Sequence, residues 1–210
     1  MQGTERDVPG LSKHRIEALS DGIFAIAMTL AVLNIDIGEL PGWTSPETLF
    51  DALLVVSPQF LHYAIAFLTL AAFWVGHTQQ YHYIHHVDRT FIWWSVLMLL
   101  AIGMIPFTTA LVGDYTSSPV AVILFAGNMF AIGVFSTLGW RHASTENRLI
   151  EKGVDPAWLI RSYHRGLIIP VVSLAVIGAA FVIPDYATAL YLVLPFIHTA
   201  VGRHSRPAAP

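Results

Sequence analysis

An acidic side chain inside the first apolar segment is the feature of this sequence with the clearest chemical consequence. Asp21 lies about one turn into an apolar run that covers residues 16–37. If such a run crosses a membrane, an ionised carboxylate within it costs at least about 3 kcal/mol. Asp21 therefore needs a partner or a function, and Arg15 is close enough in sequence to lie within two helical turns of it. The alternative is a helix that begins in the headgroup region, where Asp21 and Arg15 are both solvated.

A second polar element, His77, ends the pattern Phe73-Trp74-x-x-His77 in the next apolar run. Both His77 and Asp21 are expected near the inner face of the membrane, at similar depth. A buried cluster of Asp21, His77 and Arg15 would satisfy the hydrogen-bonding groups of all three. The alternative is that His77 is a single histidine at the membrane interface.

The stretch after His77 holds three more histidines, His82, His85 and His86. This spacing resembles the histidine boxes of membrane di-iron desaturases and hydroxylases, because clustered imidazoles suit iron. Such enzymes need about eight ligands in three boxes, whereas the other histidines here stand singly. Those single histidines are His14, His62, His142, His164, His198 and His204. We therefore expect no enzyme, no cofactor and no metal site. We expect His82, His85 and His86 to lie in a solvated cytoplasmic loop. Whether this loop senses pH or binds a metal ion is left open by the sequence.

Composition decides which elements must carry these residues. Of 210 residues, 55% are apolar and only 12% are charged, against about 25% charged in a typical soluble domain. A chain of this kind is not an ordinary soluble protein and is predicted to be an integral membrane protein. Its formal charge of −3 makes nucleic acid an unsuitable partner. It has no cysteine, which excludes disulfides and thiolate ligands.

Six apolar segments predict an all-α membrane protein with six transmembrane helices in each chain. The segments cover about residues 16–37, 58–79, 90–112, 119–140, 162–183 and 187–201. The last is short and contains Pro195. We expect residues 1–202 to form a single transmembrane domain and residues 203–210 to form a short disordered cytoplasmic tail.

A short interfacial helix is expected before the second span. Ser45, Pro46 and Glu47 form a typical helix start, with a capping side chain, a proline and an acid in the first turn. The Ser57-Pro58 pair repeats that signal and predicts a break. The alternative is one long helix kinked at Pro58.

The basic residues give the orientation. All 11 Lys and Arg residues fall on one side of a six-span arrangement, which predicts that both termini are cytoplasmic, in the cell membrane. The opposite loops carry only acids among their charged residues. These acids are Asp36, Glu39, Glu47, Asp51, Asp114 and Asp185.

The first span has one apolar stripe that Asp21 does not share. At about 100° per residue, the stripe contains Gly22, Ile26, Leu30, Leu33 and Ile37, with Thr29 at its edge. Asp21 lies about 140° from Ile26 by the same arithmetic. Periodicity by itself favours ordinary helix packing for the stripe, and a structural role against neighbouring helices for Asp21.

The first span resembles the signature Arg-x-x-x-Phe-Ser-Asp-Gly of the transmembrane protein 175 potassium channels, in their prokaryotic branch. Here it is written Arg15-x-x-x-Leu19-Ser20-Asp21-Gly22, followed by Phe24-Ala25-Ile26 and Thr29-Leu30. The resemblance continues through residues 63–67, 73–77 and 105–108, and covers the first half of the chain well. Leu19 replaces the motif phenylalanine. The family commonly has a small polar residue within the stretch that is residues 63–67 here, whereas this chain has Ala64 and Ala66. The family usually has an asparagine near the start of the third span, whereas this chain has Trp94-Ser95.

The resemblance implies a homotetrameric channel in which four first spans surround a central pore. The family constriction falls on Ile26, with further lining residues Thr29, Leu30 and Leu33. It also implies an inter-helix polar network of Arg15, Ser20, Asp21, Trp74 and His77, and an outer mouth at Asp36 and Glu39. The implied function is passive, leak-like conduction of potassium through a hydrophobic constriction, with other monovalent cations as further candidates.

Two alternatives besides the histidine-box enzyme stay open. Asp21 and His77 could form the relay of a proton-coupled transporter, although no inverted repeat is evident. A non-conducting scaffold is the other.

Overall fold

A computed structural model describes residues 12–36, 45–151 and 153–194, and within these residues the protein is a bundle of helices. The elements are α1 (Lys13–Leu30), η1 (Ala31–Asn34), α2 (Pro46–Val55), α3 (Ser57–Tyr83), α4 (Arg89–Gly103), α5 (Ile105–Asp114), α6 (Pro119–Ser144), η2 (Thr145–Asn147), α7 (Pro156–Gly166), α8 (Ile168–Ala180), α9 (Pro184–Ala187) and η3 (Thr188–Leu192).

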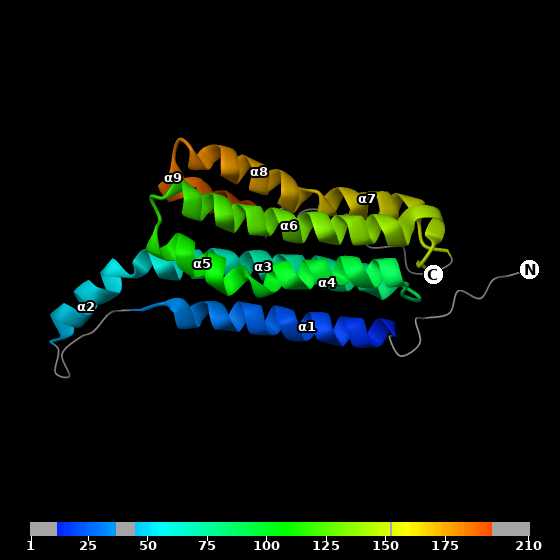
Figure 1. The fold of residues 1–210 in the computed structure, drawn as a ribbon, viewed down its shortest axis with the longest axis horizontal. Coiled ribbons are helices and arrows are strands. Elements are labelled where there is room, and N and C mark those ends of the chain that lie inside the picture. The colour runs from blue at the N-terminus through cyan, green and yellow to red at the C-terminus, as the bar shows by residue number, and fades with distance from the viewer. Residues whose placement is uncertain (1–11, 37–44, 152, 195–210) are drawn as a thin grey trace, which may run out of the picture.

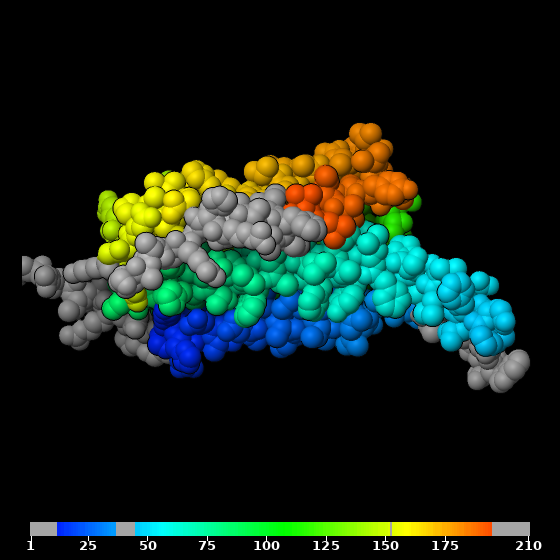
Figure 2. All heavy atoms as spheres, turned by 180° about the vertical axis from the view of Figure 1, so that it is seen from behind, coloured from blue at the N-terminus to red at the C-terminus, as the bar shows by residue number. Residues whose placement is uncertain are grey.

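The helices form three layers, which Figure 1 shows from the side. Helix α1 is one outer layer and packs on α3 and α4. Helices α3, α4 and α5 form the middle layer, and α6, α7 and α8 form the other outer layer, with α6 packed against both α4 and α8. Helix α2 projects from one end of the bundle, as the view from behind also shows (Figure 2). As a result α1 has a face that no other described helix covers.

Five of the predicted spans correspond to helices long and apolar enough to cross a membrane. These are Lys13–Asn34, Ser57–Tyr83, Arg89–Asp114, Pro119–Asn147 and Pro156–Ala180. Of the sixth predicted segment, residues 187–194 are described, in α9, η3 and the two residues after it. Residues 195–210, which include its remainder and the predicted tail, lie outside the described residues.

Two predicted spans are not the continuous helices that the apolar pattern suggested. The third is divided at Met104 into α4 and α5, because Pro106 has no N–H to donate to the carbonyl four residues earlier. The fifth begins at Pro156 rather than at residue 162, ends at Ala180 rather than at 183, and is divided at Leu167. The Pro170 ring, three residues beyond, interrupts the backbone hydrogen bonds in the same way.

The predicted short helix before the second span and the break after it are confirmed. Ser45 caps α2, and its Oγ accepts a hydrogen bond from the Thr48 N–H at 3.2 Å. Helix α2 ends at Val55 and α3 begins at Ser57. Two helices therefore stand where the alternative expected one kinked helix.

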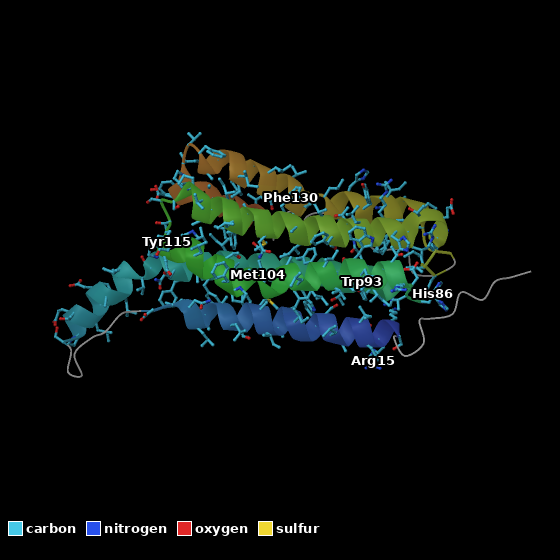
Figure 3. The ribbon with its side chains drawn as sticks, in the orientation of Figure 1. Arg15, His86, Trp93, Met104, Tyr115 and Phe130 are labelled. Atoms are coloured by element: carbon cyan, nitrogen blue, oxygen red, sulfur yellow. The ribbon has the colours of Figure 1, made fainter. Side chains whose placement is uncertain are left out.

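The two ends of the bundle differ in charge, as the charges of the predicted loops indicated. The described basic residues lie at the end where α1 begins, and the opposite end is acidic. Arg15 and His86 lie at one end and Tyr115 at the opposite end (Figure 3). Asp88 caps α4 at the basic end, and its Oδ1 accepts a hydrogen bond from the Phe91 N–H at 2.8 Å. Asp88 is therefore an acidic residue at the basic end because it caps the start of a helix.

Candidate functional site

The face of α1 that points away from the bundle carries the predicted pore residues. Ile26, Leu30 and Leu33 are 57%, 44% and 75% exposed, whereas Phe24 and Ala27, on the packed face, are almost wholly buried. The apolar stripe derived from the helical period is therefore an open surface in the single chain. Apolar side chains this exposed need lipid or another copy of the chain to cover them.

Thr29 lies on the exposed side of α1, beside this stripe. Its hydroxyl donates to the Ala25 carbonyl at 2.9 Å, with the Ile26 carbonyl at 3.1 Å. The hydroxyl hydrogen is thus occupied within the helix, whereas the oxygen keeps lone pairs that can accept a bond or coordinate a cation.

An apolar groove of about 550 Å³ lies between α1 and α4, beside the exposed stripe. Ile26 and Leu30 line it from α1, Leu99 lines it from α4, and Met104 lines it from the break between α4 and α5. Ile26, the predicted constriction residue, and Leu30, a predicted lining residue, therefore stand at the edge between the groove and the outer face, where they are not held by packing on both sides.

A polar contact joins α1 to α3 behind the stripe. Trp74 Nε1–H donates to Asp21 Oδ1 at 2.8 Å. Asp21 is also near enough to His77 to interact with it electrostatically. The structure thus brings three of the predicted network residues, Asp21, Trp74 and His77, into one place. A carboxylate that accepts an indole N–H and faces an imidazole has the partners that its position requires.

Of the two other predicted network residues, Ser20 interacts with Tyr81, whose ring packs on that of His77. Ser20 is buried, and its hydroxyl donates to the Ile16 carbonyl at 2.9 Å, within its own helix. Arg15 is exposed at the basic end of α1. Tyr81, which the sequence did not single out, lies against His77 with ring centroids 4.3 Å apart, and its hydroxyl bonds Ser95 at 2.9 Å. Its position four residues after His77, on the same helix face, is the signal that could have found it.

The other end of α1 is tied to the middle layer by hydrogen bonds. Asn34 Nδ2 donates to the Pro106 carbonyl at 3.0 Å, and Asp36 N–H donates to Gln59 Oε1 at 3.1 Å. Gln59 also donates from Nε2 to Asp114 Oδ1 at 2.8 Å. Asp36, one predicted mouth residue, is therefore exposed and anchored through its backbone. Glu39, the other, lies outside the described residues.

The histidine cluster does not assemble a metal site in the part of the chain that the structure describes. No group of three or more His, Cys, Asp or Glu side chains there could hold a metal ion. His85 and His86 are neighbours with ring centroids 5.8 Å apart. They lie in the loop after α3, at the basic end of the bundle (Figure 3).

A different histidine, His142, pairs with an acidic residue at that end. His142 Nε2 lies 2.7 Å from Asp88 Oδ2, and Arg148 lies 3.5 Å from the other ring nitrogen. Burial of Asp88 raises the pKa of that carboxyl, but hydrogen bonds from Phe91 N–H and His142 and the charge of Arg148 outweigh it. The pKa of Asp88 is therefore held below its ordinary value.

Comparisons with known proteins point to one family. The model of the family described as endosomal/lysosomal potassium channel TMEM175 matches residues 15–106. A potassium channel of Chamaesiphon minutus is 36% identical over 146 residues, which are 67% of this chain and 70% of the relative. A potassium channel of Streptomyces collinus is 32% identical over 145 residues, 67% of this chain and 69% of the relative.

A solved structure extends the likeness to the fold. The crystal structure of a lysosomal potassium-selective channel TMEM175 homolog from Chamaesiphon minutus superposes with a TM-score of 0.76. The superposition covers 90% of this chain and 96% of that one, at 27% identity.

Proposed function

This chain belongs to the TMEM175 family of potassium channels, and we propose that it conducts potassium passively across the cell membrane as a leak-like channel. The observation that carries the proposal is the open apolar face of α1, where Ile26 is 57% exposed in the single chain. The same helix holds the family signature. The exposed apolar face that needs a covering partner and the residues that define the family therefore lie on one helix.

The pore would form when four chains assemble with their α1 helices around a central axis. Helix α1 is an outer layer of the bundle (Figure 1), so its exposed face is available to neighbouring copies. Closed cyclic symmetry would then turn one apolar stripe into rings of side chains. The homotetramer with α1 lining the pore is the arrangement that we propose.

The constriction in this arrangement is a ring of Ile26 side chains, with Leu30 and Leu33 as further rings. An apolar neck excludes hydrated ions when it is narrow, because it dewets, and it conducts when it widens. The Thr29 oxygen, with its lone pairs unused, would replace part of the hydration shell of a potassium ion. Asp36 and Glu39 would raise the local concentration of cations at the outer mouth.

The contact between Asp21 and Trp74 has a structural role in this proposal. It fastens α1 to α3 at 2.8 Å, on the side of α1 away from Ile26. His77 faces the same carboxylate, and Ser20 and Arg15 belong to the same end of α1. This polar network would position the pore-lining helix rather than touch the permeating ion.

We also propose six spans, with both termini in the cytoplasm. The described basic residues support this orientation, since they gather at the end of the bundle where α1 begins and α6 ends. The outer end holds Asp36, Asp114 and Asp185 instead. The sixth span would be completed by residues beyond Leu194.

Cation flux in proteoliposomes tests the function directly. Purified protein is reconstituted, and flux is measured under potassium, sodium and caesium gradients, with protein-free vesicles as the blank. We expect passive flux that prefers potassium. An assembled and inserted protein that passes no cation would contradict the proposal. Saturable uptake driven by a proton gradient would favour the transporter instead, and bound iron after purification would favour the enzyme.

A matched pair of variants tests the constriction. Ile26→Ala should raise the basal flux or change its selectivity, because it widens the neck. Leu174→Ala is the control, since Leu174 on α8 is 56% exposed and has no place near the pore. Equal flux in both variants would remove Ile26 from the constriction.

A further inference from the structure

Two small cavities lie between the helices on the side of His77 away from α1, and the larger reaches the surface beside the exposed Val75 and Gln79. The larger has a volume of about 60 Å³ and lies between α3, α6 and α7. The smaller has about 20 Å³ and lies between α3, α4 and α6. Both are lined by His77, Gln80 and Ser136, so they meet at these three residues. His77 separates the cavities from α1, because its ring also contacts Phe24 of that helix, with centroids 5.7 Å apart.

His77 has a buried ring nitrogen that lacks a hydrogen-bond partner. Its side chain is 6% exposed, and Nε2 is buried with no hydrogen-bond partner within the described part of the chain. A buried polar atom without a partner costs about 1–3 kcal/mol. The polar atoms of native proteins avoid that cost by binding a side chain, a backbone group or an ordered water.

The broken helix on the opposite wall lacks one of its backbone hydrogen-bond donors. Gly166 lines the larger cavity and ends α7. Its carbonyl would accept from the N–H four residues later, but that residue is Pro170, which has none. In membrane proteins a backbone group released in this way is tolerated where it faces a cavity that holds water.

The lining of the larger cavity mixes groups of both electrical signs with groups that donate and accept hydrogen bonds, which fits water better than an ion. Arg165 lines the larger cavity and would repel a cation. The Gly166 carbonyl and the C-terminal end of α7 would repel an anion. Gln80, Ser136 and Ser162 each offer both a donor and an acceptor. Only a ligand that donates and accepts with equal ease satisfies this set.

The volumes agree with that assignment. A buried water requires a cavity of at least about 10–15 Å³, together with 2–4 polar partners. Both cavities therefore have room for water, and the larger has room for several molecules. Polar partners for water are present in the lining. Gln80 on α3 and Ser162 on α7 both line the larger cavity, and Gln80 Nε2 donates to Ser162 Oγ at 3.1 Å.

We propose that the two cavities hold a cluster of ordered water molecules that hydrates the inner face of His77. The cluster completes the hydrogen bonding of His77 Nε2 and of the Gly166 carbonyl, and it joins α3, α6 and α7 through water. It also places water one side chain away from the helix that the proposed function assigns to the pore. His77 is surrounded there by Asp21 from α1, Tyr81 from α3 and Arg165 from α7.

Radiolytic footprinting of the full chain tests the water cluster. Hydroxyl radicals generated from bound water oxidise adjacent side chains even where bulk solvent does not reach. Phe73 lines the larger cavity and is 7% exposed, and Phe24 and Phe125, at 0% and 1%, line neither cavity. We expect Phe73 to be oxidised several-fold faster than the two other phenylalanines. Equal rates for all three would overturn the proposal.

A variant that fills the cavity separates bound water from slight exposure. Ser136→Leu places an apolar side chain at the junction of the two cavities and should reduce the Phe73 rate to that of Phe24. Ser136→Val serves if the larger side chain prevents folding, and it should give a smaller reduction. A Phe73 rate unchanged in a folded variant would contradict bound water. The measurement needs no ion conduction, so its outcome is independent of the proposed function.

Discussion

Gly133 lies at a close approach of two helices that a single methyl group would disturb. An added Cβ at Gly133 on α6 would lie 2.5 Å from Cδ and 2.8 Å from Cγ of Pro170 on α8. It would also lie 3.2 Å from a methyl carbon of Ile169. Non-bonded carbon atoms are separated by about 3.5–4.0 Å at their optimum, so the overlap is about 1 Å. The pyrrolidine ring is rigid, and therefore the two helices must move apart.

The expected effect of Gly133→Ala follows from two opposing terms. Overpacking of this size costs about 1–3 kcal/mol, whereas alanine in a helix interior is favoured over glycine by about 1 kcal/mol. Gly127, on the same helix, has nothing within 4 Å of an added Cβ. The variant Gly127→Ala therefore gains the helix preference for alanine without the cost of overpacking. The free energies of unfolding of the two variants should differ by that packing cost, about 1–3 kcal/mol.

Thermal unfolding of the purified protein in detergent measures this difference. For a chain of this length each kcal/mol shifts the Tm by about 2–4 °C, so Gly133→Ala should melt about 2–12 °C below Gly127→Ala. Tryptophan fluorescence and loss of the size-exclusion peak give two independent readings. If the two variants melt at the same temperature, α6 and α8 do not approach as closely as the structure has them, and the reasoning fails.

Three further predictions concern the ends of α1 and the basic end of the bundle. Trp74→Phe removes the indole N–H from Asp21, a hydrogen bond to a charged group of about 1.5–3 kcal/mol, and should lower the Tm and the yield of assembled protein; an unchanged melting curve would show that Asp21 does not depend on this bond. Asn34→Leu keeps the volume but loses the bond to the Pro106 carbonyl, about 1 kcal/mol, and should alter flux more than Tm if the outer end of α1 moves; equal flux would show that the bond does not position the pore. Asp88→Ala removes a helix cap of about 1 kcal/mol. Because the pKa of Asp88 is held below its ordinary value, the stabilisation is complete above about pH 4 and is lost as the pH falls through the lower folded-state pKa. The Tm difference from the natural protein should therefore be constant at neutral pH and vanish in acid, and a difference that persists in acid would refute the charge-based explanation.

The charge difference between the two ends of the bundle and the helix starts were predictable because they depend on local chemistry. A serine, proline and acid in succession start a helix wherever the chain then goes, and Ser45 does cap α2. The helix-breaking prolines were visible as well, yet the breaks at Met104 and Leu167 were not foreseen. The apolar pattern continues across both positions, and hydropathy does not record which backbone hydrogen bonds are missing.

The candidate site was predictable only in part. The period of an α-helix placed Ile26, Leu30 and Leu33 on one stripe, and the structure places these side chains on an exposed face of α1. The period could not say whether that stripe is packed or open, because the answer depends on which neighbours cover it. Asp21 was recognised as a residue in need of partners. That Trp74 donates to it at 2.8 Å depends on how α1 and α3 cross.

By itself, then, the sequence determined that this is a helical membrane protein, where most helices begin, which end is basic and which family signature α1 carries. All of these follow from composition and from residues within a few positions of one another. Only the tertiary structure decided that Gly133 faces Pro170, that His142 rather than the histidine cluster pairs with Asp88, and that His77 borders a cavity as well as α1. These contacts join residues far apart in the chain, and their geometry arises when the helices pack, since no local pattern encodes the distance between two distant side chains.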